Sequence, residues 1–172
     1  MPGIQTTVTY LEMRDPSALR GHDSSDPRAS VVEVRGCTVS FYRYLYGAVG
    51  GQYTWVDRTR WSDERLAAYL ADPGTRVWLL QFDGCPAGYY ELRRDDDGDV
   101  EIAYFGLVPE YLGRGLGKHL LTAAVRSAWA YDPRPRRVWL HTCTLDAPQA
   151  LPNYVARGFV KYDERFEVVG GE

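Results

Sequence analysis

The stretch that decides the fold of this chain is Glu110-Tyr-Leu-Gly-Arg-Gly-Leu-Gly-Lys118. Three of its alternate positions hold glycine, namely Gly113, Gly115 and Gly117. Glycines allow unusual backbone dihedrals and let the backbone approach a ligand closely. If a helix begins here, the free N–H groups of its first turn and its dipole favour a phosphate, and Arg114 and Lys118 add positive charge. The pattern predicts a phosphate-binding turn, with a tight turn for close helix–sheet packing as the alternative.

The surroundings of this turn argue against two familiar phosphate-binding folds. A Walker loop requires Ser or Thr after Gly-Lys, whereas His119 follows Lys118. A Rossmann turn follows the first strand of a parallel sheet, whereas this turn follows an antiparallel meander. The meander is predicted from strand-like segments at 75–82, 87–94 and 99–108, with the turn signals Asp83-Gly84 and Asp97-Gly98 between them. The remaining common ligand for such a turn is the pyrophosphate of coenzyme A.

Strands and helices also alternate outside the meander. Before it we expect strands at 6–13 and 30–35, a mobile loop at 14–30, and helices at 41–49 and 62–71. After it we expect a helix at about 113–131, a strand at 137–144, a short helix at 148–157 that Gly158 caps, and a strand at 159–169. A strand–helix–strand crossover makes the segments 99–108 and 137–144 parallel. The chain is therefore expected to form one α+β domain over residues 1–172.

Bulk composition narrows the class of protein. A chain of 172 residues suits one domain, and 45% hydrophobic with 25% charged residues is ordinary for a globular protein. A net charge of −3 without a Lys/Arg-rich run argues against a nucleic-acid partner. Cys37, Cys85 and Cys143 form no CxxC pair, so neither a disulfide framework nor a metal site is expected. With no signal peptide and no apolar run of about 20 residues, we expect a cytoplasmic protein without a membrane partner.

Two motifs in this order resemble the GNAT superfamily of acetyltransferases. The family pattern is a strand, then Gln/Arg-x-x-Gly-x-Gly/Ala, then a helix, and Leu112-Gly-Arg-Gly-Leu-Gly117 is similar to it. Leu112 replaces the usual Gln/Arg, which removes one side chain but no backbone N–H group. Asn153-Tyr-Val-Ala-Arg-Gly-Phe159 resembles the family's closing motif. FGLVPEYLGRGLG and HTCTLDAPQALPNY are also similar to a bacterial subgroup of acetyltransferases, and the resemblance covers residues 76–159.

The resemblance implies a fold. The family has a central mixed, mostly antiparallel sheet of six to seven strands, flanked by about four helices. Two of its strands, here 99–108 and 137–144, are parallel and splayed, and the splay admits the pantetheine arm of acetyl-CoA. The backbone N–H of Leu107 would then face the thioester carbonyl. By resemblance, the residues that bind the coenzyme are Leu107, Val108, Leu112, Gly113, Arg114, Gly115, Leu116, Gly117, Lys118 and Asn153.

The resemblance also implies an N-acetyltransferase that moves an acetyl or related acyl group from acetyl-CoA to a primary amine of a small molecule or peptide. The expected route is direct attack in a ternary complex, because Cys143 has no neighbouring basic or histidine signature for a covalent intermediate. Family habit suggests a homodimer. Two alternatives stay open: a GNAT-like acyl-CoA-binding sensor without catalysis, which Leu112 favours, and a nucleotide-binding protein that uses the same turn.

Glu101 is the predicted general base. It lies eleven residues before Leu112, where several members of the family place a catalytic glutamate. Its neighbours in the strand are apolar, and burial raises a carboxyl pKa toward a useful range. The alternative is a glutamate on a solvated sheet face or paired with Arg. Glu91 is a second acid, which we place on the substrate side, with a structural acid as the default interpretation. Only the hairpin decides whether Glu91 shares a face with Glu101.

Tyr154 matches the family's tyrosine in the closing motif and is the predicted acid for the leaving thiolate. Asn153 beside it would bond the pantetheine amides. His141 is interpreted as a histidine at a satisfied structural position, with a general base as the alternative. Trp55 and Asp57, in an expected loop, are the predicted contacts for a cationic acceptor amine. The nearby tyrosines at helical spacing, Tyr42 and Tyr46, are interpreted as core.

Overall fold

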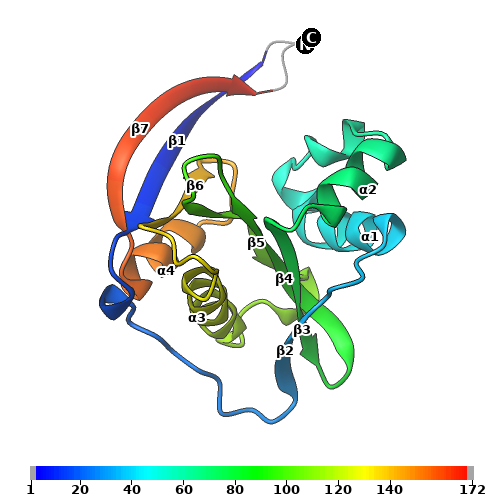
Figure 1. Cartoon of the computed structure of the whole chain (residues 1–172), viewed down its shortest axis with the longest axis horizontal. Helices are drawn as coiled ribbons and strands as arrows, with labels where there is room; N and C mark the ends of the chain where they lie inside the picture. Colours follow the sequence, from blue (N-terminus) through cyan, green and yellow to red (C-terminus); the bar gives the residue numbers. More distant parts are fainter. Residues whose placement is uncertain (1–2, 170–172) are drawn as a thin grey trace.

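The computed structural model describes residues 3–169, which form one seven-stranded mixed sheet flanked by helices on both faces (Figure 1). The strands are β1 (Ile4–Met13), β2 (Ala29–Glu33), β3 (Thr75–Phe82), β4 (Cys85–Arg94), β5 (Val100–Leu107), β6 (Val138–Cys143) and β7 (Val160–Val169). The α-helices are α1 (Val39–Gly50), α2 (Asp63–Ala71), α3 (Leu116–Trp129) and α4 (Ala150–Arg157). The strand order is β2-β3-β4-β5-β6-β1-β7. The predicted α+β fold class is confirmed, and within the described residues no helix is long and apolar enough to cross a membrane.

The meander β3-β4-β5 is confirmed, but its two turns differ. Asp83 and Gly84 both have positive φ, 54° and 82°, and join β3 to β4 as a tight two-residue turn. This is the geometry that Asp-Gly favours. The second connection runs over residues 95–99, because Arg94 pairs with Val100. It is therefore longer than a two-residue turn at Asp97-Gly98. The carboxylate of Asp95 stabilises this loop by accepting hydrogen bonds from the N–H groups of residues 97 and 99.

A β-bulge in β5 sets the direction of the acidic side chains. Glu91 pairs with Tyr104, but the next pair is Leu92 with Ile102, so Ala103 is an extra residue on β5. Side chains alternate between the two faces along a strand, and one extra residue moves every side chain before it to the opposite face. Glu101 therefore shares a face with Glu91 although Glu91 pairs with Tyr104. The sequence left this question open.

β5 and β6 are the one parallel pair among the described strands. They pair only at Val100 with Val138 and at Glu101 with Trp139, after which the strands diverge. The parallel, splayed arrangement expected for these strands is confirmed. The backbone groups of β5 beyond Glu101 on this edge therefore have no β-ladder partner, and an opening forms in the middle of the sheet.

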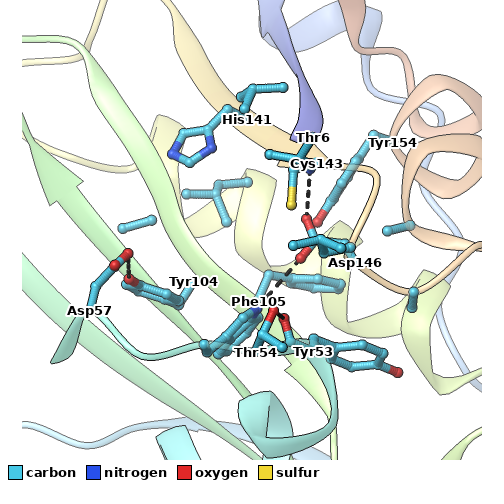
Figure 2. A pocket seen from close by; sticks show the side chains of 18 of the residues that line it. Thr6, Tyr53, Thr54, Asp57, Tyr104, Phe105, His141, Cys143, Asp146 and Tyr154 are labelled. Atoms are coloured by element: carbon cyan, nitrogen blue, oxygen red, sulfur yellow. Dashed lines mark hydrogen bonds between the residues drawn. The ribbon is translucent and has the colours of Figure 1, made fainter. Parts of the chain in front are cut away.

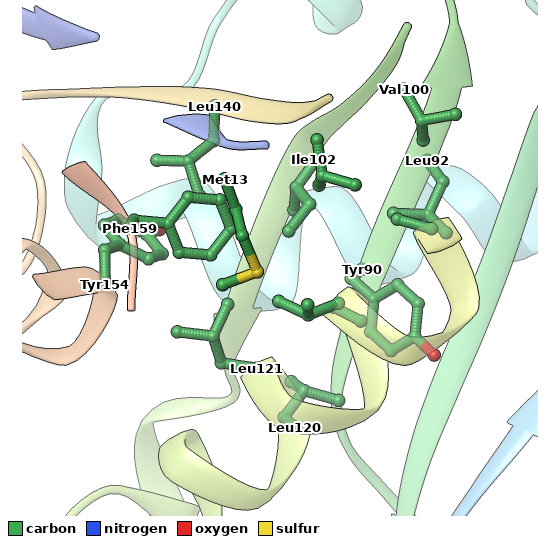
Figure 3. Close-up of a cluster of buried hydrophobic side chains, with 14 of the residues drawn as sticks. Met13, Tyr90, Leu92, Val100, Ile102, Leu120, Leu121, Leu140, Tyr154 and Phe159 are labelled. Carbon is green, nitrogen blue, oxygen red and sulfur yellow. The ribbon is translucent and has the colours of Figure 1, made fainter. Parts of the chain in front are cut away.

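Two hydrophobic clusters hold the helices on opposite faces of the sheet. The larger one joins α3 and α4 to β4, β5 and β6, and Figure 3 shows Leu120 of α3 on the side of Tyr90 and Leu121 beside Met13. The second cluster packs α1 and α2 on the other face through buried side chains that include Tyr42, Tyr46 and Leu66. Tyr42 and Tyr46 are 0% and 3% exposed, which confirms that they belong to the core.

Residues 14–28 form an irregular connection that lies against α3. The N–H of His22 donates to Thr122 Oγ1 at 2.9 Å, and the N–H of Ser24 donates to His119 Nδ1 at 3.0 Å. Asp23 adds an exposed ion pair with Arg126. These contacts tie the connection to the helix that follows the glycine turn, and its mobility stays a prediction.

β1 lies between β6 and β7, so strands from distant parts of the sequence complete the sheet (Figure 1). Leu11 and Met13 of β1 are buried against α3, whereas Thr6 and Val8 face the opposite side. The register with β7 shifts once, between Tyr10 and Leu11, and Tyr162 is the extra residue there. β1 and β7 together form a wall beside the opening between β5 and β6.

Gly158 supplies a test of the fold. Its φ is +111°, and a Cβ there would lie 2.2 Å from the carbonyl oxygen of Ala18. We expect Gly158→Ala to lower the free energy of unfolding by about 3 kcal/mol, from left-handed strain plus overpacking. Gly84 is the matched control, because its φ is +82° with no atom within 4 Å of that position. Gly84→Ala should cost only about 1 kcal/mol, and equal losses in urea denaturation would show that the contact with Ala18 is unimportant.

Candidate active site

A cavity of about 520 Å³ opens over the gap between β5 and β6 (Figure 2). The connection from α1 to α2 covers one side, and the connection from β6 to α4 covers the other. Its wall includes six side chains central to the chemistry, namely Glu101, Tyr104, Leu107, His141, Asp146 and Tyr154. Apolar and aromatic groups form most of the rest of the wall. A concave, mostly apolar site with a few polar groups is the usual form of a small-molecule pocket.

Glu101 is a half-buried carboxyl on the cavity wall. Its side chain is 19% exposed, and burial raises its pKa to about 7, with the nearby Glu91 carboxylate adding to the rise and Arg58 opposing it. A carboxyl group with a pKa near neutrality is present in both protonation states at pH 7, so it can accept and release a proton. The structure thus places the predicted base in a suitable environment.

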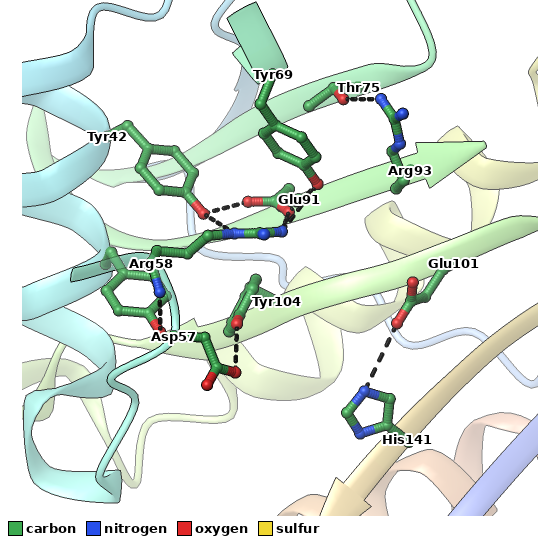
Figure 4. Close-up of polar contacts among 11 residues, drawn as sticks. Tyr42, Asp57, Arg58, Tyr69, Thr75, Glu91, Arg93, Glu101, Tyr104 and His141 are labelled. Atoms are coloured by element: carbon green, nitrogen blue, oxygen red, sulfur yellow. Dashed lines mark hydrogen bonds and ion pairs between the residues drawn. The ribbon is translucent and has the colours of Figure 1, made fainter. Parts of the chain in front are cut away.

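His141 on β6 faces Glu101, with Nε2 3.7 Å from Oε1 (Figure 4). Its side chain is 47% exposed, and partial burial of the ring lowers its pKa, which favours the neutral form. The interpretation of His141 as a satisfied structural histidine was wrong, since its ring lies on the cavity wall. A strand position opposite Tyr10 gave no signal of this, because only the splay of β6 from β5 exposes the ring.

Glu91 lies below the cavity wall in a dense polar network (Figure 4). Its side chain is 0% exposed and pairs with Arg58 Nη2 at 2.9 Å. Tyr69 OH donates to the same carboxylate at 2.6 Å, and Tyr42 OH donates to its other oxygen. A buried carboxylate is stable only when paired and hydrogen-bonded in this way. The prediction that Glu91 contacts substrate is therefore corrected, and the structural interpretation holds: Glu91 pairs with Arg58 and anchors α1 and α2 to the sheet.

The end of β5 presents Leu107 to the gap. The N–H of Val108 donates to the carbonyl of Ala87 on β4 at 2.8 Å. Successive N–H groups of a strand point to opposite edges, so the N–H of Leu107 points toward the diverged β6. Val108 itself does not reach the cavity: it is buried, and its carbonyl accepts from the N–H of Tyr111. The predicted contact of Val108 with coenzyme is corrected for that reason.

The glycine turn continues the cavity toward solvent. Gly113 and Gly115 have φ of +77° and +76°, and no atom lies within 4 Å of a Cβ built at either position. Their conformation favours glycine, and the space above them is open. Gly115 is the N-cap of α3, so the free N–H groups of the first turn of the helix point to this space. These are the features that a phosphate site requires.

The other residues of the turn fall into two groups. Leu112 and Gly117 lie on the cavity wall, whereas Leu116, the first residue of α3, is buried in the larger hydrophobic cluster. Arg114 and Lys118 are exposed, and the Arg114 guanidinium lies 5.4 Å from the ring centre of Tyr111. Leu112 therefore replaces a polar side chain with an apolar wall and leaves the backbone geometry of the turn intact.

Asn153 and Tyr154 project from α4 toward the opposite wall. Asn153 Nδ2 donates to the carbonyl of Gly117 at 3.2 Å, and its Oδ1 is buried without a partner. A buried amide oxygen without a partner is costly unless a ligand or water satisfies it. Tyr154 is 7% exposed, and burial raises the pKa of its phenol, so the group stays protonated. Both residues line the cavity, and their predicted roles toward a coenzyme stay predictions.

Trp55 and Asp57 line the side of the cavity formed by the connection from α1 to α2. The Trp55 indole packs directly on Gly50, where a Cβ would lie 2.2 Å from the ring. Tyr104 OH donates to Asp57 Oδ2 at 3.3 Å. Both residues thus lie on the wall as predicted, and both also have structural contacts.

Asp146 is a wall residue that sequence reasoning missed. Its Oδ2 accepts from Thr142 Oγ1 at 2.6 Å and from the N–H of Cys143 at 2.9 Å, while Oδ1 lies 3.5 Å from Trp55 Nε1. It links the β6–α4 connection to the loop that carries Trp55. The contact joins residues far apart in sequence, and no local pattern could indicate it.

Comparisons with known proteins agree with this geometry. The sequence profile described as Acetyltransferase (GNAT) family matches residues 42–159. An uncharacterized N-acetyltransferase of Mycobacterium bovis is 39% identical over 79 residues, which are 46% of this chain and 49% of that protein. The chain thus spans about half the length of this curated relative.

Solved structures agree in fold. A functionally unknown conserved protein from Staphylococcus epidermidis has a TM-score of 0.70 at 17% identity, over 96% of this chain and 61% of that chain. The GCN5-related N-acetyltransferase from Kribbella flavida has a TM-score of 0.69 at 17% identity, over 96% and 59%. At this identity the likeness concerns the fold alone. The profile match over residues 42–159, however, shows that the chain belongs to the GNAT acetyltransferase family.

Proposed function

We propose that this chain transfers an acetyl group from acetyl-CoA to a primary amine of a small molecule or peptide, by direct attack of the amine. The observation that carries the proposal is the half-buried Glu101 carboxyl, with a pKa of about 7, on the wall of a cavity that opens between splayed parallel strands. Family membership supports the use of acetyl-CoA. The geometry supports a base and a coenzyme site in one cavity.

The residues present fit acetyl-CoA at three points. The turn at Gly113 and Gly115 has open space and free helix N–H groups for the pyrophosphate. The unpartnered Oδ1 of Asn153 accepts an amide N–H of the pantetheine arm. The backbone N–H of Leu107 points into the gap, where it would face the thioester oxygen. When bound, acetyl-CoA supplies an acetyl group activated as a thioester.

Glu101 removes the proton that an amine carries at neutral pH, directly or through one water. A carboxylate with a pKa near 7 is a stronger base than an ordinary glutamate and is still ionised in part at pH 7. The neutral His141, 3.7 Å from Glu101, lies beside the path of that proton. Trp55 and Asp57 orient the acceptor from the opposite wall, where an aromatic face and a carboxylate favour a cation.

Negative charge develops on the thioester oxygen during attack, and the backbone N–H of Leu107 stabilises it. Tyr154 keeps its proton, because burial raises the pKa of the phenol, and it would stabilise the leaving thiolate by donating a hydrogen bond as the carbon–sulfur bond breaks. That thiolate, with a thiol pKa near 8.5 in solution, leaves readily in any case, so this donation is the smaller effect.

The first prediction concerns Glu101. We expect kcat/KM of the wild type to rise about tenfold per pH unit below pH 7 and to level off above it, because the base must be deprotonated. Glu101→Gln should lower kcat/KM by about 100-fold or more and abolish the rise of kcat/KM with pH below pH 7. Acetyl-CoA should bind the variant as it binds the wild type, which also separates an enzyme from an acyl-CoA sensor.

His141→Asn is the control for this profile. It should lower kcat/KM by less than about tenfold and keep the rise of kcat/KM with pH below pH 7. If His141→Asn abolishes this rise with pH and Glu101→Gln keeps it, the histidine is the base and the assignment to Glu101 is wrong.

The second prediction concerns Tyr154. Tyr154→Phe removes the phenol proton and leaves the packing of the ring, so kcat should fall about tenfold to 100-fold while KM for acetyl-CoA stays near its wild-type value. Steady-state kinetics with thiol release as the readout tests this. An unchanged kcat would show that the thiolate leaves without an acid.

The third prediction concerns the coenzyme. A thermal-shift titration should give a saturable rise in melting temperature with acetyl-CoA and CoA, and none with ATP. Asn153→Ala should weaken acetyl-CoA binding about tenfold, since one buried hydrogen bond is lost. Leu151→Ala on the same helix is the matched control, because Leu151 is exposed and lies off the cavity wall. No shift with either CoA ligand would overturn the acyltransferase proposal.

A further inference from the structure

A row of three polar residues crosses the sheet beside the cavity, with Thr75 on β3, Arg93 on β4 and Glu101 on β5. Thr75 pairs with Arg93, and Arg93 pairs with Glu101. Residues directly opposite each other on antiparallel strands have their side chains on the same face, with Cβ atoms about 5 Å apart. A side chain as long as arginine can therefore turn toward either neighbour. If the guanidinium turned toward Glu101, it would form an ion pair with that carboxylate.

The guanidinium of Arg93 instead points away from Glu101 (Figure 4). Its Nη1 donates to Thr75 Oγ1 at 2.7 Å and lies 3.1 Å from Asp72 Oδ1. The ring of Tyr69 adds a cation–π contact, because the guanidinium carbon lies 5.2 Å from the ring centre. Arg93 and Glu101 both line the cavity, yet other partners hold the guanidinium away from the carboxyl.

The turn between α2 and β3 fixes the carboxylate of Asp72. Asp72 is the C-cap of α2, and its Oδ1 accepts from the N–H of Gly74 at 2.7 Å. The side chain is 44% exposed, and an ion pair at such a position contributes little to the free energy of unfolding. The pair of Asp72 with Arg93 therefore matters mainly for where the guanidinium lies.

Other charged and ionisable groups also act on Glu101. Glu91 on β4 and Asp95 in the connection from β4 to β5 raise its pKa, and Arg58 lowers it. Arg58 is already paired with Glu91, and His141 on β6 lies 3.7 Å from the Glu101 carboxyl. With these groups in place, the pKa of Glu101 is about 7. An opposite charge within about 4–6 Å lowers a carboxyl pKa by about one to three pH units, so an added guanidinium would change this value strongly.

We propose that Asp72 and Thr75 are positioning residues, which hold the Arg93 guanidinium away from Glu101 and so leave that carboxyl free to accept the proton of the amine. The inference rests on the proposed function, in which Glu101 is the base. Without the charge of Asp72, Arg93 turns toward Glu101, because the cross-strand carboxylate is then the nearest unpaired partner on its face of the sheet. The ion pair stabilises the ionised carboxyl and makes it a weaker base.

Titration of the Glu101 carboxyl by ¹³C NMR tests the positioning without any substrate, with the signal assigned by its absence from Glu101→Gln. Asp72→Asn keeps an oxygen for the N–H of Gly74 but removes the charge, so the pKa of Glu101 should fall by about one pH unit or more. Thr75→Val removes the other acceptor and should lower the pKa in the same direction. Circular dichroism checks the fold of each variant.

A double-mutant cycle shows whether Asp72 acts through Arg93. Arg93→Gln alone should not lower the pKa of Glu101, and Asp72→Asn should have little further effect in the Arg93→Gln background. Asp63→Asn is the matched control, because Asp63 on α2 forms an exposed ion pair with Arg43 and lies off the cavity wall. It should leave the titration unchanged. An unchanged pKa in Asp72→Asn, or an equal fall with and without Arg93, would overturn the proposal.

The pH dependence of kcat/KM is the second readout. A carboxyl with a lower pKa is ionised at lower pH, so in Asp72→Asn the rise of kcat/KM should level off about one pH unit below its wild-type position. The plateau should fall about threefold or more, because the base is weaker. A fall in the NMR pKa without a matching change of the kinetic profile would mean that Arg93 is positioned as proposed but that Glu101 is not the base.

Discussion

The short parallel pairing of β5 with β6 is the constraint on which the rest of the structure depends. Only two residue pairs join these strands before they diverge. A sheet that stayed paired would satisfy the backbone groups at the end of β5 and leave no space between the two strands. Divergence instead frees the N–H of Leu107, exposes His141 and opens the cavity. The α3 helix then covers one face of the gap and places the glycine turn at its end, so the phosphate-binding feature and the gap are parts of one arrangement.

Two glutamates on one face of the sheet have opposite fates, and their surroundings explain the difference. Glu91 has a guanidinium and two phenols around it and is fully buried. Glu101 is partly exposed, and among the described residues its ion-pair contact is with His141; burial raises its pKa, and the nearby Glu91 carboxylate adds to the rise. The Glu91–Arg58 pair therefore supplies a fixed pair of charges beside Glu101, whose carboxyl changes protonation near pH 7. Proton transfer at neutral pH requires a carboxyl such as Glu101, whose protonation can change there. The paired Glu91 holds α1 and α2 against the sheet.

Much of the fold could be predicted because it follows local rules. Asp83-Gly84 has the turn that its residues favour, and Gly158 caps α4 with positive φ. The glycine turn and the register of Glu101 followed from motif spacing. The extra residue Ala103 could not be predicted, since a bulge depends on packing on both faces of a strand. Asp146 was missed for a similar reason, because its partners lie in segments that only the tertiary fold brings together.

The place of β1 between β6 and β7 has a consequence for how the chain acquires its structure. During synthesis β1 emerges before every other strand, yet its neighbours Cys143 and Arg165 belong to the last two strands. Contacts between residues so far apart in sequence form slowly, because a long loop must close first. Leu11 and Met13 must stay without their native neighbours during that interval. The wall of the cavity is therefore completed late, and the nascent chain must protect an apolar strand until then.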